Sequence, residues 1–551
     1  MIFAIGCRPF PMPDASQTPI AQQVARRRTF AIVSHPDAGK TTLTEKLLLF
    51  AGAIQIAGSV KARKAARHAT SDWMEIEKQR GISVASSVMQ FEYRDCVINL
   101  LDTPGHQDFS EDTYRVLTAV DAALMVIDAG KGIEPQTLKL LEVCRLRHTP
   151  VLTFVNKLDR EVRPPLELID EIERVLGMAP APLTWPIGCG KEFRGVLDFR
   201  TERIRLLDAG ESRLSDNVAQ LPFRDPAAAG LLGAAYEGAL AEADLVRAAG
   251  STFDGAEFLA GRQTPVFFGS AINNFGVKEV LDALVDFAPA PAKRAAAERM
   301  VDPAESRFSG VVFKIQANMD PLHRDRIAFL RICSGRFSRG MRLVNCRNGK
   351  DVRTANAVSF LSQRRETVEE GFAGDIIGIP NHGTLSLGDT LSEGEILGFG
   401  GLPSFAPELF RRVELASPMK SKQLRTGLRQ LSEEGAVQIF QPRDGGPILV
   451  AAAGALQFEV AVHRLQHEYG VEMRLPPAAY TLARWISSPD PKELERFIDR
   501  HRDRIADDAA GVPAYLATTK YDLAATQERW PLIEFHTRRE HTGLAQTEAL
   551  A

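Results

Sequence analysis

Residues 34–42 read SHPDAGKTT and come directly after the apolar stretch TFAIV at residues 29–33. The β-branched and apolar side chains of that stretch predict a short buried strand. After the loop, Leu43, Leu47 and Leu48 recur at helical spacing. Strand, glycine-containing loop and helix form the context in which the pattern G-x-x-x-x-G-K-[ST] binds nucleotide phosphates.

The loop departs from this pattern at Ser34, which stands where the first glycine is expected. A serine fits there if its backbone keeps an ordinary dihedral angle. Lys40 would then reach the β- and γ-phosphates, and the hydroxyl of Thr41 would bind Mg²⁺. On this motif alone, a helix start without a ligand stays open as the alternative. The predicted phosphate loop comprises Ser34, His35, Pro36, Asp37, Ala38, Gly39, Lys40, Thr41 and Thr42.

A second predicted strand, DCVINLL at residues 95–101, ends in DTPGH at residues 102–106. An aspartate at the end of a strand beside a phosphate loop can hold Mg²⁺ through water, which is the role expected of Asp102. Gly105 would allow a close approach to the γ-phosphate, and His106 would lie next to the attacking water. In isolation, an exposed loop histidine is the simpler interpretation of His106. The predicted nucleotide-binding residues of this motif are Asp102, Thr103, Pro104, Gly105 and His106.

Two later strands end in motifs that suit a guanine base. VLTFV at residues 151–155 leads into NKLD at 156–159, and PVFF at 265–268 leads into GSA at 269–271. A carboxylate at Asp159 would accept hydrogen bonds from guanine N1–H and N2–H₂, whereas adenine offers a lone pair at N1. The amide of Asn156 would brace the loops, and Lys157 would lie along the base. The backbone N–H groups of the GSA segment would meet guanine O6. The predicted base-binding residues are Asn156, Lys157, Leu158, Asp159, Gly269, Ser270 and Ala271.

Each motif is modest alone, but together they occur in one order, each at the carboxyl end of a predicted strand. Ligands bind at that edge of open α/β sheets. We therefore predict a GTP-binding domain over residues 26–290 that hydrolyses GTP, with GTP/GDP and Mg²⁺ as cofactors. The base motif disfavours an ATPase.

The composition is that of a soluble globular protein, with 44% hydrophobic and 25% charged residues. The 551 residues suggest about three or four domains. A net charge of -3 gives no overall basic field, so any nucleic-acid contact must be local. The six cysteines lack C-x-x-C spacing, and no apolar run approaches the ~20 residues of a membrane span, so we expect a cytoplasmic protein without a membrane partner.

SHPDAGKT, DTPGH, NKLD and GSA resemble the translational GTPases, the family of elongation factors Tu and G. The stretch SDWMEIEKQRGIS at residues 71–83 resembles the family's first switch segment, which ends in R-G-I-T. Ser83 stands at the threonine position and keeps the hydroxyl that would bind Mg²⁺. In this family the histidine of DTPGH positions the hydrolytic water once the ribosome has oriented it. The resemblance therefore implies that His106 is catalytic.

Longer blocks, such as LLDTPGHQDFSEDTYR, TWPIGCGK, FKIQANMDPLHRDR, SFAPELFRR and QLSEEGAVQ, resemble the peptide chain release factor 3 family. The blocks run from about residue 25 to Trp485, and residues 1–20 and 202–262 depart from the family most. The resemblance implies a ribosome-dependent GTPase of translation termination that promotes release and recycling of class-I release factors. Its partners would be the ribosome, with its RNA and proteins, and the class-I factor through the ribosome. We expect a monomer without a DNA partner.

Beyond the first domain, residues 291–305 are rich in proline and alanine and predict a linker. Residues 306–405 show period-two strands at 308–315, 326–333, 341–346 and 375–379, which predict a β-barrel. Residues 406–551 predict an α+β domain. Its first part is ferredoxin-like, with the order strand 409–415, helix 419–433, strands 437–440 and 448–452, helix 455–469 and strand 471–475, and a helix over 491–505 with mixed strands follows.

On the helix expected at 419–433, Leu424, Leu428 and Leu431 share one face and Lys422, Arg425 and Arg429 share another. The basic face suits RNA phosphates, and a solvated surface is an equal alternative. The same alternatives, with disorder as a third, apply to Lys61, Arg63, Lys64 and Arg67. Residues 1–25 predict a disordered extension, with Met12 as a candidate start.

Two other functions remain as alternatives. One is an elongation or translocation factor of the same superfamily. Translocases, however, carry further C-terminal domains, and this chain is too short for them. The other is a regulatory nucleotide-binding scaffold without turnover, which the intact DTPGH motif disfavours.

Overall fold

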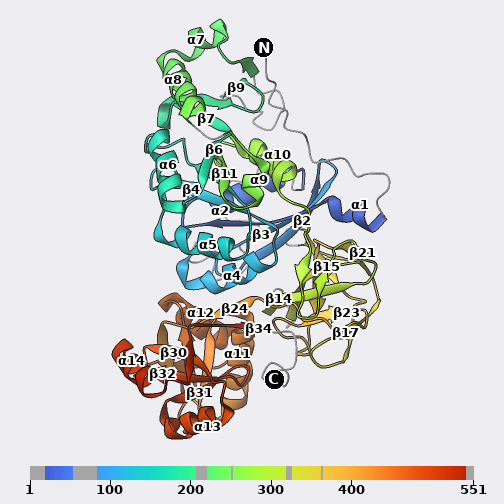
Figure 1. The fold of residues 1–551 in the computed structure, drawn as a ribbon, viewed down its shortest axis with the longest axis vertical. Helices are drawn as coiled ribbons and strands as arrows, with labels where there is room; N and C mark the ends of the chain where they lie inside the picture. The colour runs from blue at the N-terminus through green and yellow to red at the C-terminus, as the bar shows by residue number, and fades with distance from the viewer. Residues whose placement is uncertain are drawn as a thin grey trace.

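The computed structural model describes residues 19–53, 83–206, 220–249, 252–317, 326–361 and 364–541. Figure 1 shows an α/β domain at one end, a β-barrel beside it and an α+β domain at the other end. No helix in these ranges is long and apolar enough to cross a membrane. The basic residues expected at 61–67 and most of the stretch 71–83 lie outside the described residues.

The first domain is built on a seven-stranded sheet in the order β2-β3-β1-β4-β5-β11-β6, parallel except for β2. Along β1, Phe30 and Ile32 belong to one apolar cluster and Ala31 and Val33 to another, so both faces of the sheet are buried. The strands are β1 Arg27–Ser34, β2 Ser87–Tyr93, β3 Cys96–Asp102, β4 Ala122–Asp128, β5 Val151–Asn156, β6 Ala179–Pro182 and β11 Gln263–Phe268. The helices around it are α2 Lys40–Phe50, α4 Ser110–Thr118, α5 Pro135–Leu146, α6 Pro165–Glu171, α9 Gly255–Leu259 and α10 Val277–Phe287.

A smaller four-stranded sheet extends this domain, and its strands β9 and β10 with helices α7 and α8 belong to the stretch that departs from the family. Its order is β10-β9-β8-β7, and helix α8 packs on β7. The elements are β7 Thr184–Ile187, β8 Gly195–Asp198, β9 Arg203–Leu206, β10 Gln220–Pro222, α7 Pro226–Leu232 and α8 Ala234–Ala249.

The barrel contains the predicted strands as β14, β15, β17 and β22, in an eight-stranded sheet of order β18-β17-β23-β14-β15-β22-β19-β20. A short ladder of β16 with β21 completes it. The strands are β14 Ser309–Ala317, β15 Arg326–Ser334, β16 Arg336–Ser338, β17 Arg342–Asn345, β18 Asp351–Arg353, β19 Val358–Leu361, β20 Arg364–Thr367, β21 Glu370–Phe372, β22 Ile376–Pro380 and β23 Thr390–Ser392.

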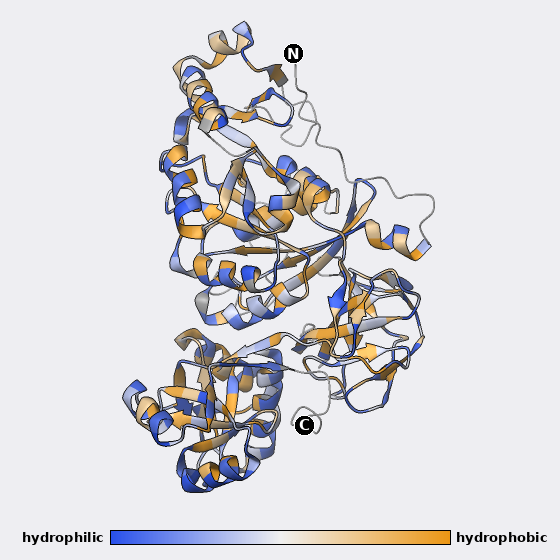
Figure 2. Cartoon of the chain, viewed as in Figure 1, coloured by the Kyte–Doolittle hydropathy of each residue, from blue (hydrophilic) through white to orange (hydrophobic). Residues whose placement is uncertain are grey.

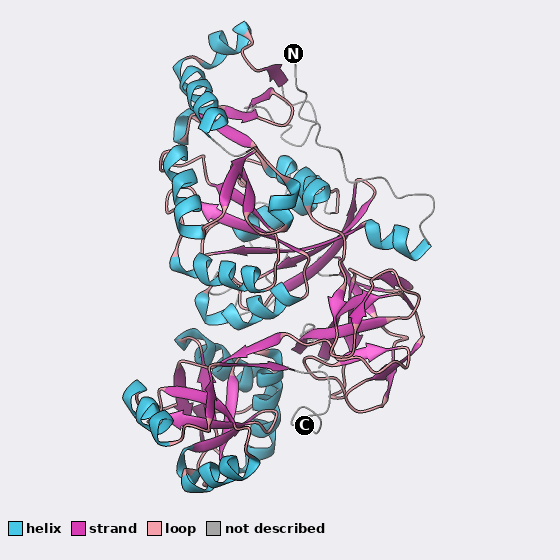
Figure 3. Cartoon of the chain, viewed as in Figure 1, coloured by secondary structure: helices cyan, strands magenta, loops and turns pink. Residues whose placement is uncertain are grey.

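The C-terminal domain consists of two ferredoxin-like units joined edge to edge, and Figure 3 shows it as strands flanked by helices. In the first unit, β28 lies between β25 and β27, and β26, which continues β25, pairs with β29. In the second unit the order is β33-β30-β32-β31, and β31 pairs with β27 of the first. The first unit comprises β25 Leu409–Arg412, β26 Glu414–Leu415, α11 Ser421–Glu434, β27 Gln438–Pro442, β28 Leu449–Ala452, α12 Ala455–Tyr469 and β29 Met473–Arg474. The second comprises β30 Leu482–Ser487, α13 Pro491–Arg500, β31 Ile505–Asp508, β32 Pro513–Ala517, α14 Lys520–Arg529 and β33 Glu534–His536.

Four sequence expectations about boundaries need correction. The helix predicted over 491–505 ends at Arg500, because a short 3-10 turn and strand β31 follow it. Residues 402–405, placed in the barrel, form β24 Leu402–Phe405 and pair with β34 Arg538–His541. The linker contains a small hairpin of β12 Arg294–Ala295 and β13 Met300–Val301. Residues 19–25 of the predicted disordered extension form α1 Pro19–Ala25, which packs against the barrel strand β21, and residues 1–18 lie outside the described residues.

Buried polar contacts join the barrel to the first domain. Asp375 of the barrel accepts hydrogen bonds from Arg27 and Asn99 of the first domain. Arg331 of the barrel, which is buried, donates to Asp121 at 2.6 Å. In Figure 2 hydrophobic segments are frequent along the strands of each domain, while hydrophilic segments are frequent on the outer helices and loops.

Candidate functional site

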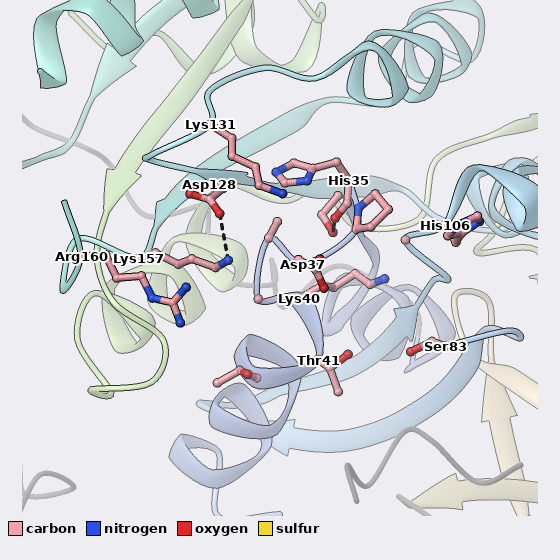
Figure 4. A pocket seen from close by; sticks show the side chains of 16 residues that line it. His35, Asp37, Lys40, Thr41, Ser83, His106, Asp128, Lys131, Lys157 and Arg160 are labelled. Carbon is pink, nitrogen blue, oxygen red and sulfur yellow. Dashed lines mark hydrogen bonds and ion pairs between the residues drawn. The ribbon is translucent and has the colours of Figure 1, made fainter. Parts of the chain in front are cut away.

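The nine residues of the predicted phosphate loop line one cavity of about 580 Å³ at the carboxyl end of β1 (Figure 4). Strand β1 lies between β3 and β4, so the chain after β1 passes first to the β3 side of the sheet and later to the β4 side. The crevice at such a switch point is where parallel sheets bind ligands. Lys40 and Thr41 begin α2, whose first-turn N–H groups are available to phosphate oxygens.

Ser34 ends strand β1 with an ordinary backbone, since it is not among the described residues of positive φ. Its hydroxyl donates to the carbonyl of His35 at 2.8 Å. By contrast, Gly39 has a φ of 91° and no room for a side chain, because a Cβ there would lie 2.4 Å from Nδ2 of Asn156. The loop therefore needs a glycine at its second conserved position and tolerates serine at its first.

Asn156 connects the phosphate loop to the GSA segment. Its Nδ2 donates to the carbonyl of Ala38 at 2.8 Å, and its Oδ1 accepts from the amide of Ala271 at 2.9 Å. A Cβ on Gly269 would lie 2.4 Å from the carbonyl of Phe275, so this turn also requires glycine. The arrangement is the one expected of a bracing residue.

Of the other residues of the NKLD motif, Lys157 lines the same cavity, whereas Leu158 and Asp159 are not among the lining residues. Lys157 donates to Asp128 Oδ2 at 2.8 Å. Asp159 accepts a hydrogen bond from the hydroxyl of Ser270, which joins the two predicted base-binding segments. Leu158 is fully buried and contributes packing, with its amide donating to the carbonyl of Gly269.

Three oxygen-bearing side chains were predicted to hold Mg²⁺: Thr41, Ser83 and Asp102. Thr41 and Ser83 line the cavity, and in Figure 4 both lie on the same side of Lys40. Asp102 is buried at the end of β3, with Oδ1 3.9 Å from Lys40 Nζ. Hydroxyl and carboxylate oxygens are the donors that Mg²⁺ prefers, so the residues present fit this ion.

The rest of DTPGH places a glycine and a histidine at the edge of the cavity. Gly105 lies close to the loop, since a Cβ there would be 3.4 Å from the carbonyl of His35. Thr103 and Pro104 are buried and hold the segment, with Thr103 Oγ1 donating to the carbonyl of Ile32 at 2.7 Å. His106 lines the cavity with a side chain that is 33% exposed, and Figure 4 shows its ring pointing away from Lys40.

Three charged residues of the cavity were not singled out from the sequence: Asp128, Lys131 and Arg160. Burial alone would raise the pKa of Asp128, but hydrogen bonds from Lys157 and from the amide of Gly130 outweigh it and lower the pKa. Asp128 could have been found from the sequence, because it ends the apolar run AALMVID at residues 122–128, which has the pattern of another buried strand.

His35 was predicted as a loop residue, and its imidazole is fully buried. Nδ1 lies 3.3 Å from Oε2 of Glu134. Burial lowers the pKa of His35 despite the opposing effect of Glu134, so the ring is neutral at pH 7. It therefore adds no positive charge next to the phosphates.

The basic face predicted on the C-terminal helix lies on α11. Lys422, Arg425 and Arg429 are exposed, whereas Leu424 and Leu428 are buried. The separation of the two faces agrees with the sequence pattern. A cation stripe of this kind can contact phosphates outside the nucleotide site.

Family profiles match three segments of the chain. Residues 25–290 match the elongation factor Tu GTP binding domain, residues 307–394 match elongation factor G domain 2, and residues 399–527 match the class II release factor RF3 C-terminal domain. These segments correspond to the three domains of the structure.

Curated relatives match almost the whole chain. Peptide chain release factor 3 of Nitrosomonas europaea is 66% identical over 527 residues, which cover 95% of this chain and 98% of that protein. Peptide chain release factor 3 of Bordetella avium is 64% identical over 526 residues, with the same coverage. A crystal structure from Thermus thermophilus superposes with a TM-score of 0.65 at 24% identity, covering 84% of this chain and 70% of that one, which supports the fold alone.

Proposed function

Since the chain belongs to the peptide chain release factor 3 family and is a GTPase of translation termination, we propose that the ribosome stimulates its GTP hydrolysis and that this cycle releases class-I release factors after peptide release. One observation carries the proposal. The phosphate loop, Ser83, Gly105, His106 and Lys157 line a single cavity, although they come from segments far apart in the chain.

His106 is the proposed catalytic residue. It lies at the cavity edge near Gly105, where a water attacking the γ-phosphate would be held. Its partly exposed ring has to turn toward the loop to orient that water, and we propose that the ribosome favours this orientation. Such positioning is the main contribution a protein makes to phosphoryl transfer.

The γ-phosphate is the proposed link between hydrolysis and conformation. Ser83 ends the predicted first switch segment, and we propose the DTPGH motif as the second. Ser83 and Gly105 both line the cavity, so both segments can contact the terminal phosphate. Its loss would relax both segments. Different affinities for two ribosome states would then let the nucleotide shift the equilibrium between them.

Guanine selection is assigned to Asp159, with Asn156, Lys157 and the GSA segment in support. An Asp159→Asn variant should bind GTP more weakly and accept xanthine nucleotides, since xanthine offers an acceptor where guanine has an amino group. Unchanged GTP affinity in that variant would contradict the assignment.

Mg²⁺ would be held by Thr41 and Ser83, with Asp102 acting through water. The ion would supply positive charge to the phosphates when bound. These three side chains are the ones to replace if the metal site is to be tested.

The ribosome and, through it, a class-I factor are the proposed macromolecular partners, and we propose that the protein acts in the cytoplasm as a monomer. The exposed cations of α11 are proposed as a contact for ribosomal RNA phosphates. Such a contact predicts that ribosome binding weakens as salt rises.

The proposal is tested by following a labelled class-I release factor on post-termination ribosomes. The chain with GTP should accelerate its dissociation, while GDP and no nucleotide should not. His106→Ala should keep GTP binding and lose the ribosome-stimulated hydrolysis. Intact ribosome-stimulated hydrolysis without accelerated dissociation would instead favour an elongation-type factor.

A further inference from the structure

Asp108 touches both the proposed catalytic residue and the C-terminal domain. It lies in a short 3-10 turn, Gln107–Phe109, between DTPGH and α4. The backbone amide of Asp108 donates to Nδ1 of His106 at 3.3 Å, and the carboxylate Oδ1 lies 3.3 Å from the same nitrogen. Oδ2 accepts a hydrogen bond from the amide of Leu456 at 2.8 Å. Its side chain is 7% exposed. Asp108 therefore contacts His106 through its backbone amide and its carboxylate, and the C-terminal domain through its carboxylate.

The C-terminal partner is the N-terminus of α12, and it is shaped for this carboxylate. Gly454 precedes the helix, and a Cβ there would lie 1.9 Å from Cγ of Asp108. The backbone of Gly454 is extended, with φ −146° and ψ 166°, so a larger residue would suit the backbone. The glycine is needed because of the space that Asp108 occupies.

The contact belongs to a wider junction. Phe109, Val84 and Val460 form an apolar cluster, with Leu456 packed against it. These residues come from the segment after Ser83, the turn after His106 and helix α12. The residues that follow Ser83 and His106 are therefore packed against the C-terminal domain at one place.

The barrel fixes the same junction from its other side. Lys314 is buried and donates to the carbonyl of Ser86 at 2.7 Å, and it lies 3.2 Å from Asp112 of α4. The amide of Ser86 also donates to Asp112 at 2.7 Å. Movement of the segment after Ser83 or of α4 would disturb contacts in all three domains.

We propose that Asp108 is a positioning residue that holds His106 away from the nucleotide while α12 is docked on it, and that undocking of α12 frees His106 to turn toward the phosphate loop. This inference rests on the catalytic role proposed for His106. Coupling of this kind is reciprocal, so a rearranged His106–Asp108 turn binds α12 less tightly. The C-terminal domain thereby restrains hydrolysis in the arrangement seen here.

The test uses Gly454→Ser in the full chain. The serine Cβ displaces the Asp108 carboxylate, while the serine hydroxyl can itself cap α12, so the helix keeps its stability. GTP hydrolysis without ribosomes should rise at least about fivefold, the lower end of typical coupling. Ribosomes should stimulate the variant by a smaller factor than the original chain. Ala453→Ser, one residue earlier and exposed, is the matched control and should leave both rates unchanged.

The double variant Gly454→Ser with His106→Ala separates the possible outcomes. We expect that Gly454→Ser no longer raises ribosome-free GTP hydrolysis when His106 is replaced by alanine. A ribosome-free rate that stays unchanged in Gly454→Ser, or one that rises equally without His106, would overturn the role of Asp108. If His106→Ala alone keeps full ribosome-stimulated hydrolysis, the proposed catalytic role of His106 fails, independently of the result for Gly454.

Discussion

The two ferredoxin-like units of the C-terminal domain have the same strand order but begin their second helices differently. In the second unit, Thr519 precedes α14 and its hydroxyl accepts from the amide of Asp522 at 3.1 Å. In the first unit, Gly454 precedes α12 and has no side chain, and the amide of Leu456 donates to Asp108 of the nucleotide-binding domain. The backbone at the two positions is nearly the same, with φ −146° in both and ψ 162° and 166°.

The second unit is self-contained, whereas the first depends on the neighbouring domain. The second unit caps its own helix, so its stability should not depend on the nucleotide. The first unit receives its cap from the turn that carries His106, so its docking and the nucleotide site share a contact. The same fold can therefore be independent of the nucleotide or respond to it. Which of the two applies depends on whether the unit itself or the nucleotide-binding domain caps its second helix.

The largest expected difference between the units concerns their Arg–carboxylate pairs. In the first unit Arg464 and Glu434 are 5% and 4% exposed, and in the second Arg504 and Asp522 are 34% and 23% exposed. Arg464→Leu leaves a buried carboxylate and should cost about 3–5 kcal/mol of stability. Arg504→Leu should cost about 1 kcal/mol or less, because solvent screens the pair.

Hydrogen exchange of the β28 and β32 amides in increasing urea measures the stability of the first and second units separately. It checks the expected losses of stability in both variants. Equal losses for the two variants would mean that the buried pair is not the stronger constraint.

A smaller effect is expected from removing the helix cap of the second unit. Thr519→Ala should lower the stability of that unit by about 1 kcal/mol, since it removes an N-cap hydrogen bond. GTP hydrolysis, with and without ribosomes, should stay the same. The urea midpoint of β32 exchange and a steady-state GTPase assay measure the two effects. A changed hydrolysis rate would show that the second unit is not self-contained.

The smallest expected effect is a pH dependence confined to the second unit. Burial, with a further contribution from Arg504 and Arg500, lowers the pKa of His501, and Asp503 and Asp522 oppose this only in part. The unfolded chain then takes up a proton before the folded one, so stability present at higher pH is lost as pH falls below about 6.5. His501→Phe should abolish this loss. Exchange of β32 amides between neutral and mildly acidic pH measures it, and an equal loss in the variant would exclude His501 as the source.

The nucleotide site could be predicted from the sequence because its motifs are short and local. Each lies at the end of an apolar strand, so Lys40, Asp102, Asn156 and Asp159 could be placed at one sheet edge without knowing any long-range contact. The ordinary backbone at Ser34 was also foreseeable, since serine does not readily adopt a positive φ.

The contacts that join the domains could not be predicted in this way. Asp108 and Leu456 are separated by 348 residues, and Gly454 resembles any turn glycine before a helix. The pairing of β24 with β34 likewise joins distant segments. The second unit was missed because helix α13 is followed at once by a short turn and strand β31, and the apolar period does not mark where the helix ends.

The most direct test of the coupling measures hydrogen exchange at the first turns of α12 and α14 in the full chain, with GDP and with a non-hydrolysable GTP analogue. The account predicts that the Leu456 amide exchanges faster with the GTP analogue, because Asp108 moves with the switch segments, while the Asp522 amide is unchanged. Equal exchange at Leu456 with both nucleotides, or a parallel change at Asp522, would contradict it.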